Sequence, residues 1–506
     1  MPERYWLETL GCPKNQVDSD KLAGMLERDG YVVAATPAEA DLVVVNTCAF
    51  IEAAREESIG TILTLADERR EGARLVVTGC MAERYGDELA ASLPEVDLVA
   101  PFGVPVSLGR KAGVGPHAGP VAPAGPVAPA GPVAFGGALP GGPIPLRSAR
   151  SPETQPVPTL DLLNLPRPPV DAPWAYVKVA EGCDRRCGFC AIPSFRGKQR
   201  SRPLRAVLAE IAQLASGRVP LREVVLVAQD LASYGLDRSG ASRVDRAVLS
   251  ADDGFGTLRE GPKTGSNRPI VDLVHAVGSM VDRVRLLYLY PSSLDHALID
   301  AVLGTGVAYF DLSLQHVSRP LLQRMRRWGD GERFLERIAD IRRDEPAAAF
   351  RSSFIVGYPG ETEEDHDALL AWLAEARLDW VGFFPYSRED GTHAAGLDDQ
   401  VPPALVAERL AECVEIQDPI TAARRDASIG EVIEVLVDAP GEGRSYREAP
   451  EIDGIVSVPL DLPVGTVVPV VVTGADGPDL VAQPVPGSGE GPDHRGADGN
   501  RWAAVR

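Results

Sequence analysis

The sequence is poor in cysteine and histidine, with seven of each among 506 residues. Seven cysteines, an odd number at uneven intervals, do not form a disulfide framework, and clustered thiols in a reducing compartment are more often metal ligands or catalytic groups. The chain also lacks a run of about 18 apolar residues. Its first residues, MPERYWLETLGCPKN, show no charged start followed by an apolar segment. We therefore expect a cytoplasmic protein with no membrane segment.

Basic residues are also in deficit. The chain has 51 lysines and arginines against 72 acids, a formal net charge of −21 at pH 7. This charge argues against a surface that follows a phosphate backbone throughout, although it allows a local basic patch. The length is sufficient for about three domains of roughly 150 residues each.

Composition changes along the chain at several places. A segment rich in Pro, Gly and Ala repeats GPVAPA, as a linker would, and a later polar, Gly-bearing segment resembles an insertion. After about residue 425 the helical patterns give way to short β-rich runs. We predict an N-terminal domain at 1–110, a linker at 111–170, a central domain at 171–424 with an insertion at about 237–268, a small β-barrel at 425–487, and a flexible tail at 488–506.

In the N-terminal domain, short apolar segments alternate with amphipathic helical segments, which predicts a Rossmann-like parallel α/β domain. Three predicted strands, in YWLETLGC, DLVVVNTC and RLVVTGC, end at Cys12, Cys48 and Cys80. Because the carboxyl ends of parallel strands share one edge of a sheet, these thiols should converge there. The alternative is that each cysteine fills space at a strand end, since free cysteine is often buried.

The central domain contains six predicted strands separated by mostly helical segments, which favours a partial (βα)6 TIM-type barrel with its chemistry at the strand carboxyl ends. Just after the first strand, EGCDRRCGFC places Cys183, Cys187 and Cys190 within eight positions. A structural zinc site needs four protein ligands, and no histidine is close in sequence to this triplet. A zinc ion held by the three cysteines and one water remains an alternative. Thiolates also hold iron–sulfur clusters, and a four-iron cluster with three cysteines leaves one iron free to bind another group.

The spacing CxxxCxxC, with Phe189 before the last cysteine, resembles the signature of the radical S-adenosylmethionine (SAM) superfamily. The resemblance implies that SAM binds the open iron of a 4Fe–4S cluster held by Cys183, Cys187 and Cys190. One electron then cleaves SAM to a 5′-deoxyadenosyl radical. Phe189 is expected beside the adenine of SAM, with local packing as its alternative.

The segments LGCPKNQVDSD, NTCAF and TGCMAERY resemble the N-terminal domain of the methylthiotransferases within that superfamily, and the terminal OB-like barrel resembles a TRAM domain. The family resemblance implies a second 4Fe–4S cluster held by Cys12, Cys48 and Cys80. It also implies two SAM molecules per product, one as methyl donor and one as radical source, together with a sulfur donor and an electron donor. No catalytic side chain is assigned.

The segments YFDLSLQHVSRPLLQRMRR and GRSYREAPEIDG resemble the ribosomal branch of the family. Its members add a methylthio group to the β-carbon of an aspartate in small-subunit ribosomal protein S-twelve. The transfer RNA enzymes usually carry Gln-Ser-Gly where this chain has Gln315 and His316. Ser313 stands where proline is expected, and the roles of both Ser313 and His316 are left open. Cys413, within a helical pattern, is expected to pack.

Charge near the C-terminus bears on the partner. Residues 430–487 contain ten acids and two arginines, so this barrel should repel RNA, and we expect no direct binding of transfer RNA. Two other functions remain as alternatives. One is a methylthiotransferase acting on an adenosine of transfer RNA, and the other is a non-catalytic iron–sulfur protein. Gly357 and Gly360 in VGYPGE are expected to shape a turn near the cofactor or an ordinary βα turn.

Overall fold

The computed structural model describes residues 2–106, 161–238 and 268–486. These residues form two compact units, one within Met1–Thr421 and one within Ala422–Arg506. The predicted tail and most of the predicted linker and insertion lie outside the described residues. Among the described helices, none has the length and apolar character needed to cross a membrane.

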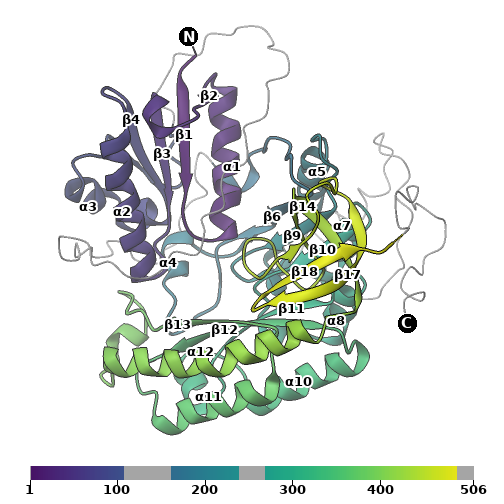
Figure 1. Ribbon diagram of the computed structural model, residues 1–506. Helices are drawn as coiled ribbons and strands as arrows, with labels where there is room; N and C mark the ends of the chain where they lie inside the picture. The colour runs from purple at the N-terminus through teal and green to yellow at the C-terminus, as the bar shows by residue number, and fades with distance from the viewer. Residues whose placement is uncertain (1, 107–160, 239–267, 487–506) are drawn as a thin grey trace. The chain divides into compact units, whose positions relative to one another are not determined.

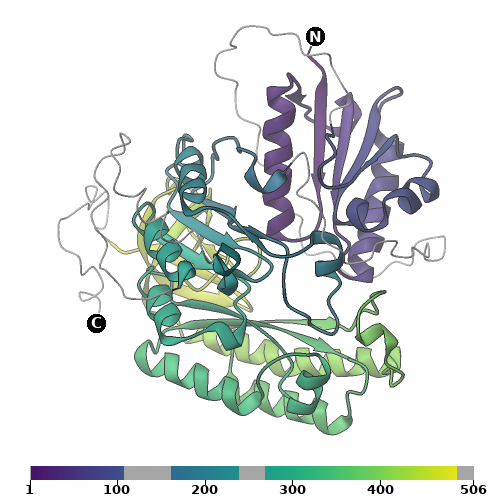
Figure 2. The same cartoon turned by 180° about the vertical axis from the view of Figure 1, so that it is seen from behind.

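The N-terminal region is a five-stranded parallel sheet with helices on both faces (Figures 1 and 2). Leu42 and Val44 pack with the helix that covers one face, whereas Val43 and Val45 pack with the two helices on the other, as strand alternation requires. The predicted Rossmann-like domain is therefore confirmed. In sheet order the strands are β2 (Val32–Val33), β1 (Arg4–Thr9), β3 (Leu42–Thr47), β4 (Arg74–Gly79) and β5 (Leu98–Ala100). The helices are α1 (Pro13–Arg28), η1 (Pro37–Glu39), α2 (Glu52–Glu68) and α3 (Cys80–Ser92).

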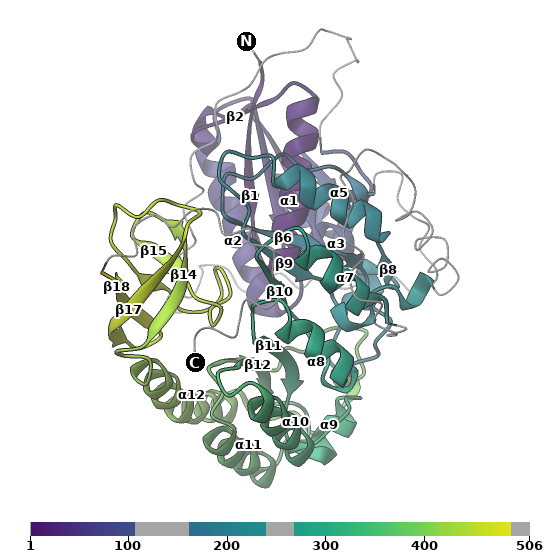
Figure 3. The ribbon, with the colours of Figure 1, turned by 90° about the vertical axis from the view of Figure 1, so that its right-hand side faces the viewer.

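The central region contains the six predicted strands as two three-stranded parallel sheets (Figure 3). A parallel bridge between Leu289 and Leu312 joins the two sheets, which confirms the partial barrel. The first sheet, in order, consists of β10 (Arg283–Leu286), β9 (Glu223–Val227) and β6 (Trp174–Lys178). The second consists of β11 (Tyr309–Gln315), β12 (Ala349–Val356) and β13 (Trp380–Pro385). A short pair, β7 (Ala180–Glu181) and β8 (Arg200–Ser201), brackets the cysteine-rich loop.

Ser313 lies at the seam between these two sheets. Its backbone N–H donates to the carbonyl of Leu289 (2.9 Å), and the N–H of Leu289 donates to the carbonyl of Asp311 (2.9 Å). Proline has no N–H and could not make the first of these bonds. The departure from the expected proline therefore adds a backbone hydrogen bond across the seam.

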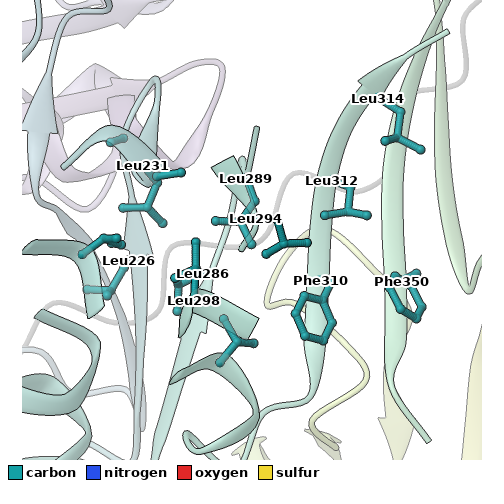
Figure 4. Close-up of a cluster of buried hydrophobic side chains, with 14 of the residues drawn as sticks. Leu226, Leu231, Leu286, Leu289, Leu294, Leu298, Phe310, Leu312, Leu314 and Phe350 are labelled. Carbon is teal, nitrogen blue, oxygen red and sulfur yellow. The ribbon is translucent and has the colours of Figure 1, made fainter. Parts of the chain in front are cut away.

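Helices cover the outside of the barrel, and leucine and phenylalanine side chains fill the space between strands and helices (Figure 4). Phe310 and Phe350 stack across β11 and β12 with ring centroids 5.5 Å apart. The α-helices are α4 (Ile192–Arg196), α5 (Leu204–Leu214), α7 (Pro269–Gly278), α8 (His296–Leu303), α9 (Arg319–Arg324), α10 (Gly331–Asp344), α11 (Glu363–Ala376) and α12 (Pro403–Asp426). Short 3-10 turns are η2 (Leu162–Asn164), η3 (Leu231–Ser233), η4 (Leu236–Arg238), η5 (Pro291–Ser293) and η6 (Ala394–Gly396).

The second compact unit contains a closed five-stranded barrel, as predicted. Valines dominate its interior, among them Val435, Val456, Val470 and Val472. In barrel order the strands are β14 (Val432–Ala439), β15 (Glu442–Arg444), β16 (Val456–Ser457), β18 (Asp479–Pro484) and β17 (Val467–Asp476).

Candidate functional site

The first three cysteines lie at the carboxyl ends of three adjacent parallel strands. Cys12 lies three residues after the end of β1 and directly precedes α1, Cys48 follows β3 directly, and Cys80 is the first residue of α3 after β4. Since β1, β3 and β4 are neighbours in the sheet, the three strand ends share one edge.

Two glycines allow these turns to approach one another. A Cβ atom at Gly11 would lie 2.8 Å from Cys48 Cβ and 3.0 Å from its Sγ, and one at Gly79 would lie 2.6 Å from the backbone N of Thr47. Both glycines also have left-handed backbones, with φ of +96° and +90°. The glycine before Cys12 and the glycine before Cys80 are therefore required by the packing of the site.

Asn15, a buried residue of α1, connects all three turns. Its Nδ2 donates to the carbonyls of Leu10 (2.9 Å) and Thr47 (3.0 Å), and its Oδ1 lies 3.6 Å from Cys80 Sγ. One side chain thus contacts the segments that carry each cysteine. The sequence analysis missed this residue, although it stands three positions after Cys12 in the same motif.

Arg196 brings a cation to this site from the central barrel. Its Nη2 donates to Cys80 Sγ (3.0 Å) and to Asn15 Oδ1 (2.7 Å), and its Nη1 pairs with Glu181 Oε1 (2.8 Å). The Arg196 side chain is only 3% exposed, and Asp18 adds a second carboxylate at 3.4 Å. Arginine presents several donors in a fixed fork, which allows it to join a thiol of one sheet to carboxylates on both sides.

The charges around these thiols differ in their effects. Burial opposes ionisation of Cys12, but the cations of Lys14 and Arg196 outweigh it, and the pKa of Cys12 falls below its usual value. Burial, together with the charges of Cys80 and Cys12, raises the pKa of Cys48 to about 12. Burial also raises the pKa of Cys80, although Arg196 opposes this shift. The three thiols at this edge of the sheet therefore differ in their charge environments.

The second triplet lies in one loop after β6 and β7. The backbone N–H of Cys183 donates to the carbonyl of Gly197 (3.1 Å), and that of Cys190 donates to the carbonyl of Cys187 (3.2 Å). Burial is the main cause that raises the pKa of Cys183 to about 11 and that of Cys190 to about 12, and neighbouring cysteines add to both shifts. Cys187 and Cys190 are partly exposed, so this triplet faces an accessible region.

Two arginines flank this loop and enclose an aromatic ring. Arg327 Nη1 lies 3.5 Å from Cys187 Sγ, and its guanidinium lies 4.0 Å from the ring centroid of Tyr290. The Arg185 guanidinium lies 3.7 Å from the same ring and pairs with Asp230 (2.6 Å). The loop that carries the second triplet is thus bordered by positive charge at the carboxyl end of β10.

The remaining predicted residues have local partners. Phe189 is partly buried against the barrel core, and Cys413 is fully buried in α12, as its helical pattern predicted. The backbones of Gly357 and Gly360 are left-handed, and the N–H of Gly357 donates to Glu361 Oε2 (2.6 Å). His316 is fully buried, its Nδ1 accepts from the N–H of Ser318 (3.1 Å), and burial lowers its pKa to about 4.

The donor set fits clusters better than single ions. Within the described residues, no three His, Cys, Asp or Glu side chains are arranged to bind one metal ion. In a 4Fe–4S cluster each cysteine binds a different iron, so its sulfurs are farther apart than those around one zinc ion. Two groups of three neighbouring thiols, with no histidine among them, match the ligands that such clusters use.

Comparison with protein families gives three matches in chain order. Residues 4–101 match the uncharacterized protein family UPF0004, residues 177–373 match the radical SAM superfamily, and residues 429–485 match the TRAM domain. The fold, the cysteine loop and these matches define a radical SAM enzyme with a TRAM domain.

Full-length relatives identify the family more closely. The chain is 40% identical over 500 residues to the ribosomal protein uS12 methylthiotransferase RimO of Nocardioides sp. (strain ATCC BAA-499 / JS614), covering 94% of this chain and 96% of the relative. It is 40% identical over 470 residues to the protein of that name from Moorella thermoacetica, covering 92% and 95%. The chain therefore belongs to the family of ribosomal protein uS12 methylthiotransferases RimO. It is a radical SAM methylthiotransferase that uses SAM and an iron–sulfur cluster.

Among solved structures, the chain is similar to the cobalamin-dependent S-adenosylmethionine radical enzyme OxsB with aqua-cobalamin and S-adenosylmethionine bound. The two are 11% identical with a TM-score of 0.42, and the match covers 82% of this chain and 56% of that chain. The assignment to a family rests on the sequence relatives alone.

Proposed function

We propose that this protein adds a methylthio group to the β-carbon of an aspartate in ribosomal protein uS12, with two 4Fe–4S clusters. The observation that carries the proposal is the identity of 40% to uS12 methylthiotransferases along nearly the whole chain, together with two cysteine triplets at strand carboxyl ends. Cys183, Cys187 and Cys190 would hold the radical-forming cluster. Cys12, Cys48 and Cys80 would hold the auxiliary cluster.

The protein's own groups would bind and orient these cofactors. When bound, the clusters supply the electron that cleaves SAM and a site for the transferred sulfur. Arg327 places positive charge beside Cys187, and Arg196 donates to Cys80, so each cluster would receive one hydrogen bond from a buried or half-buried arginine. Hydrogen bonds to cluster sulfurs influence reduction potential. Phe189, at the rim of the barrel core, is the proposed contact for the adenine of SAM.

The substrate proposal is supported by charge on the TRAM barrel, although fewer carboxylates contribute than the sequence suggests. Glu448 is fully buried against Arg425 (2.5 Å), and Asp438 pairs with Arg444 (2.5 Å), so these groups stabilise the barrel. Five carboxylates remain on the exposed surface: Glu431, Glu434, Glu451, Asp461 and Asp476. An acidic surface favours a basic ribosomal protein and disfavours free transfer RNA.

The proposal further includes an electron donor, a sulfur donor and a cytoplasmic location beside the ribosome. Its test is mass spectrometry of small-subunit proteins from a strain that lacks this gene. We expect uS12 to lose one methylthio group, with restoration by the intact gene and not by a Cys183→Ala copy. An unchanged uS12 mass, with loss of methylthioadenosine from transfer RNA, would favour the transfer RNA enzyme.

A further inference from the structure

Lys14 is a buried cation between the two parts of the candidate site. It stands in the first turn of α1, two residues after Cys12, and is only 8% exposed. Its Nζ lies 3.5 Å from the ring centroid of Tyr288, which follows β10 in the barrel. The side chain thus extends from the turn of the first cysteine triplet to the carboxyl end of a barrel strand, where barrel enzymes place their chemistry.

The partners of Lys14 differ from those of the other buried lysines. Lys178 pairs with Glu181 (2.7 Å) and with Asp18, and Lys21 lies 3.5 Å from Glu210 and donates to the carbonyl of Leu163 (2.7 Å). Within the described residues, no carboxylate lies within salt-bridge distance of the Lys14 ammonium. Lysine is rarely buried without such a partner because removing its charge from water is costly.

Tyr288 is held in an unusual conformation beneath this ammonium. Its φ is +66°, a left-handed value that costs a non-glycine residue roughly 1–3 kcal/mol. The backbone N–H donates to Asp311 Oδ2 (2.9 Å), and Asp311 is in turn paired with Arg351 (3.1 Å). Strain held in place by neighbouring groups is frequent at ligand-binding positions.

We propose that Lys14, on the face of Tyr288, binds the side-chain carboxylate of the substrate aspartate and thereby selects aspartate as the modified residue. This inference rests on the proposed function. The carboxylate carbon is bonded directly to the β-carbon that receives sulfur. A cation that holds the carboxylate must therefore lie within a few bond lengths of the reacting carbon, and Lys14 is adjacent to the thiols proposed for sulfur delivery. A neutral amide or an adenine would bring no negative charge to the ammonium.

The test uses the full-length protein with reconstituted clusters and two synthetic peptides from uS12, one with the target aspartate and one with asparagine there. Peptide binding is measured anaerobically by fluorescence anisotropy, without SAM or reductant. We expect the wild-type protein to bind the aspartate peptide about tenfold more tightly. Lys14→Met should remove this preference by weakening only the aspartate peptide, and Lys14→Arg should restore part of it.

Lys198→Met is the matched control because Lys198 is an exposed lysine of the same unit. It should keep the wild-type preference. Iron content and formation of 5′-deoxyadenosine without peptide are measured for each Lys14 variant, which separates substrate recognition from cluster binding. In turnover, Lys14→Met should raise KM for the aspartate peptide more than it lowers kcat.

Several outcomes would overturn the inference. A full aspartate preference in Lys14→Met would do so, as would equal weakening of both peptides. If Lys14→Met loses iron, Lys14→Gln replaces it, and loss of iron in both would assign Lys14 a purely structural role. If the wild-type protein neither binds nor modifies the aspartate peptide, the proposed function itself fails. If the wild-type protein modifies the peptide and Lys14→Met discriminates equally well, only the role of Lys14 fails.

Discussion

The two cysteine triplets are assembled in opposite ways. Cys183, Cys187 and Cys190 belong to one loop, and their spacing is set by eight consecutive residues. Cys12, Cys48 and Cys80 belong to three βα turns and meet only because β1, β3 and β4 are adjacent in a sheet. The first group is therefore encoded locally, whereas the second depends on the whole N-terminal fold. Substitutions and changes in stability should affect them differently.

The largest expected effect follows from removing the local triplet. Changing Cys183, Cys187 and Cys190 together to alanine should abolish reductive cleavage of SAM and lower iron from about eight to about four atoms per chain. The N-terminal sheet contributes no ligand to this loop, so the auxiliary cluster should remain. Iron analysis and chromatography of 5′-deoxyadenosine measure both effects. Reductive cleavage by this variant would show that the radical-forming cluster is elsewhere.

Removing the dispersed triplet should separate the cleavage of SAM from the transfer of sulfur. With Cys12, Cys48 and Cys80 changed to alanine, we expect 5′-deoxyadenosine to form at a measurable rate while methylthiolated uS12 peptide disappears. Alanine fits at buried strand ends, so the barrel should keep its fold, and circular dichroism of the variant provides that control. Normal amounts of methylthiolated product from this variant would refute a role for these cysteines in sulfur transfer.

The contrast also explains what could be predicted from sequence. The local triplet is evident in the sequence from its spacing. The dispersed triplet is evident from the equivalent positions of its cysteines after three predicted strands, because parallel strands place their ends at one edge. The six barrel strands and the terminal β-barrel were predicted from alternating apolar patterns. These features depend on short-range patterns or on general rules of sheet topology.

Contacts across the fold were not predictable in the same way. The side chain of Arg196 donates to that of Asn15, which lies 181 positions away in the sequence. The Asn15 side chain in turn contacts Cys80, which is 65 positions away. Nothing near Arg196 in sequence indicates that its guanidinium would lie against a thiol of another sheet. The burial of Glu448 against Arg425 could not be predicted either, because a count of acidic residues does not distinguish a buried carboxylate from an exposed one. The Gly-Cys pairs at Gly11 and Gly79 were visible signals that could have been used.

A smaller effect is expected from Arg196, which links Cys80 of the dispersed triplet to the carboxylates of Glu181 and Asp18. Arg196→Met should lower the free energy of unfolding by about 3 kcal/mol, since it leaves Glu181 and Asp18 short of a buried counter-charge. It should also weaken the binding of the auxiliary cluster and not that of the radical-forming cluster, because only the dispersed triplet loses a hydrogen bond, the one from Arg196 to Cys80 Sγ. Urea unfolding of the metal-free protein and iron retention of the reconstituted protein measure these effects.

Arg200→Met is the matched control for Arg196. Arg200 lies four residues further on, and its side chain is 33% exposed while it pairs with Asp161. An ion pair with this exposure contributes about 0–1 kcal/mol, so this variant should unfold near the wild-type urea concentration and keep both clusters. Equal destabilisation by the two substitutions, or equal loss of both clusters in Arg196→Met, would contradict the linking role.

The smallest expected effect is a difference in reactivity between the individual thiols of the metal-free protein. The pKa of Cys12 is lowered by Lys14 and Arg196 despite burial, whereas burial raises the pKa of Cys48 to about 12 and that of Cys183 to about 11. A lowered pKa populates the reactive thiolate at lower pH. Iodoacetamide at pH 8 should therefore modify Cys12 first. A rise from pH 7 to pH 9 should increase the rate of modification of Cys12 by a smaller factor than that of Cys183.

Lys14→Met should slow the modification of Cys12 at pH 8 by a few-fold, because it removes the cation with the larger effect on the pKa of this thiol. Lys198→Met should leave the rate unchanged, since that exposed lysine does not contribute to the shift. Mass spectrometry of peptides after timed quenching resolves each cysteine. Faster modification of Cys48 than of Cys12, or identical pH profiles for Cys12 and Cys183, would show that the dispersed triplet does not create a distinct charge environment. Slower modification in Lys14→Met with intact unfolding free energy would show that a cation next to the first cysteine acts on the thiol directly.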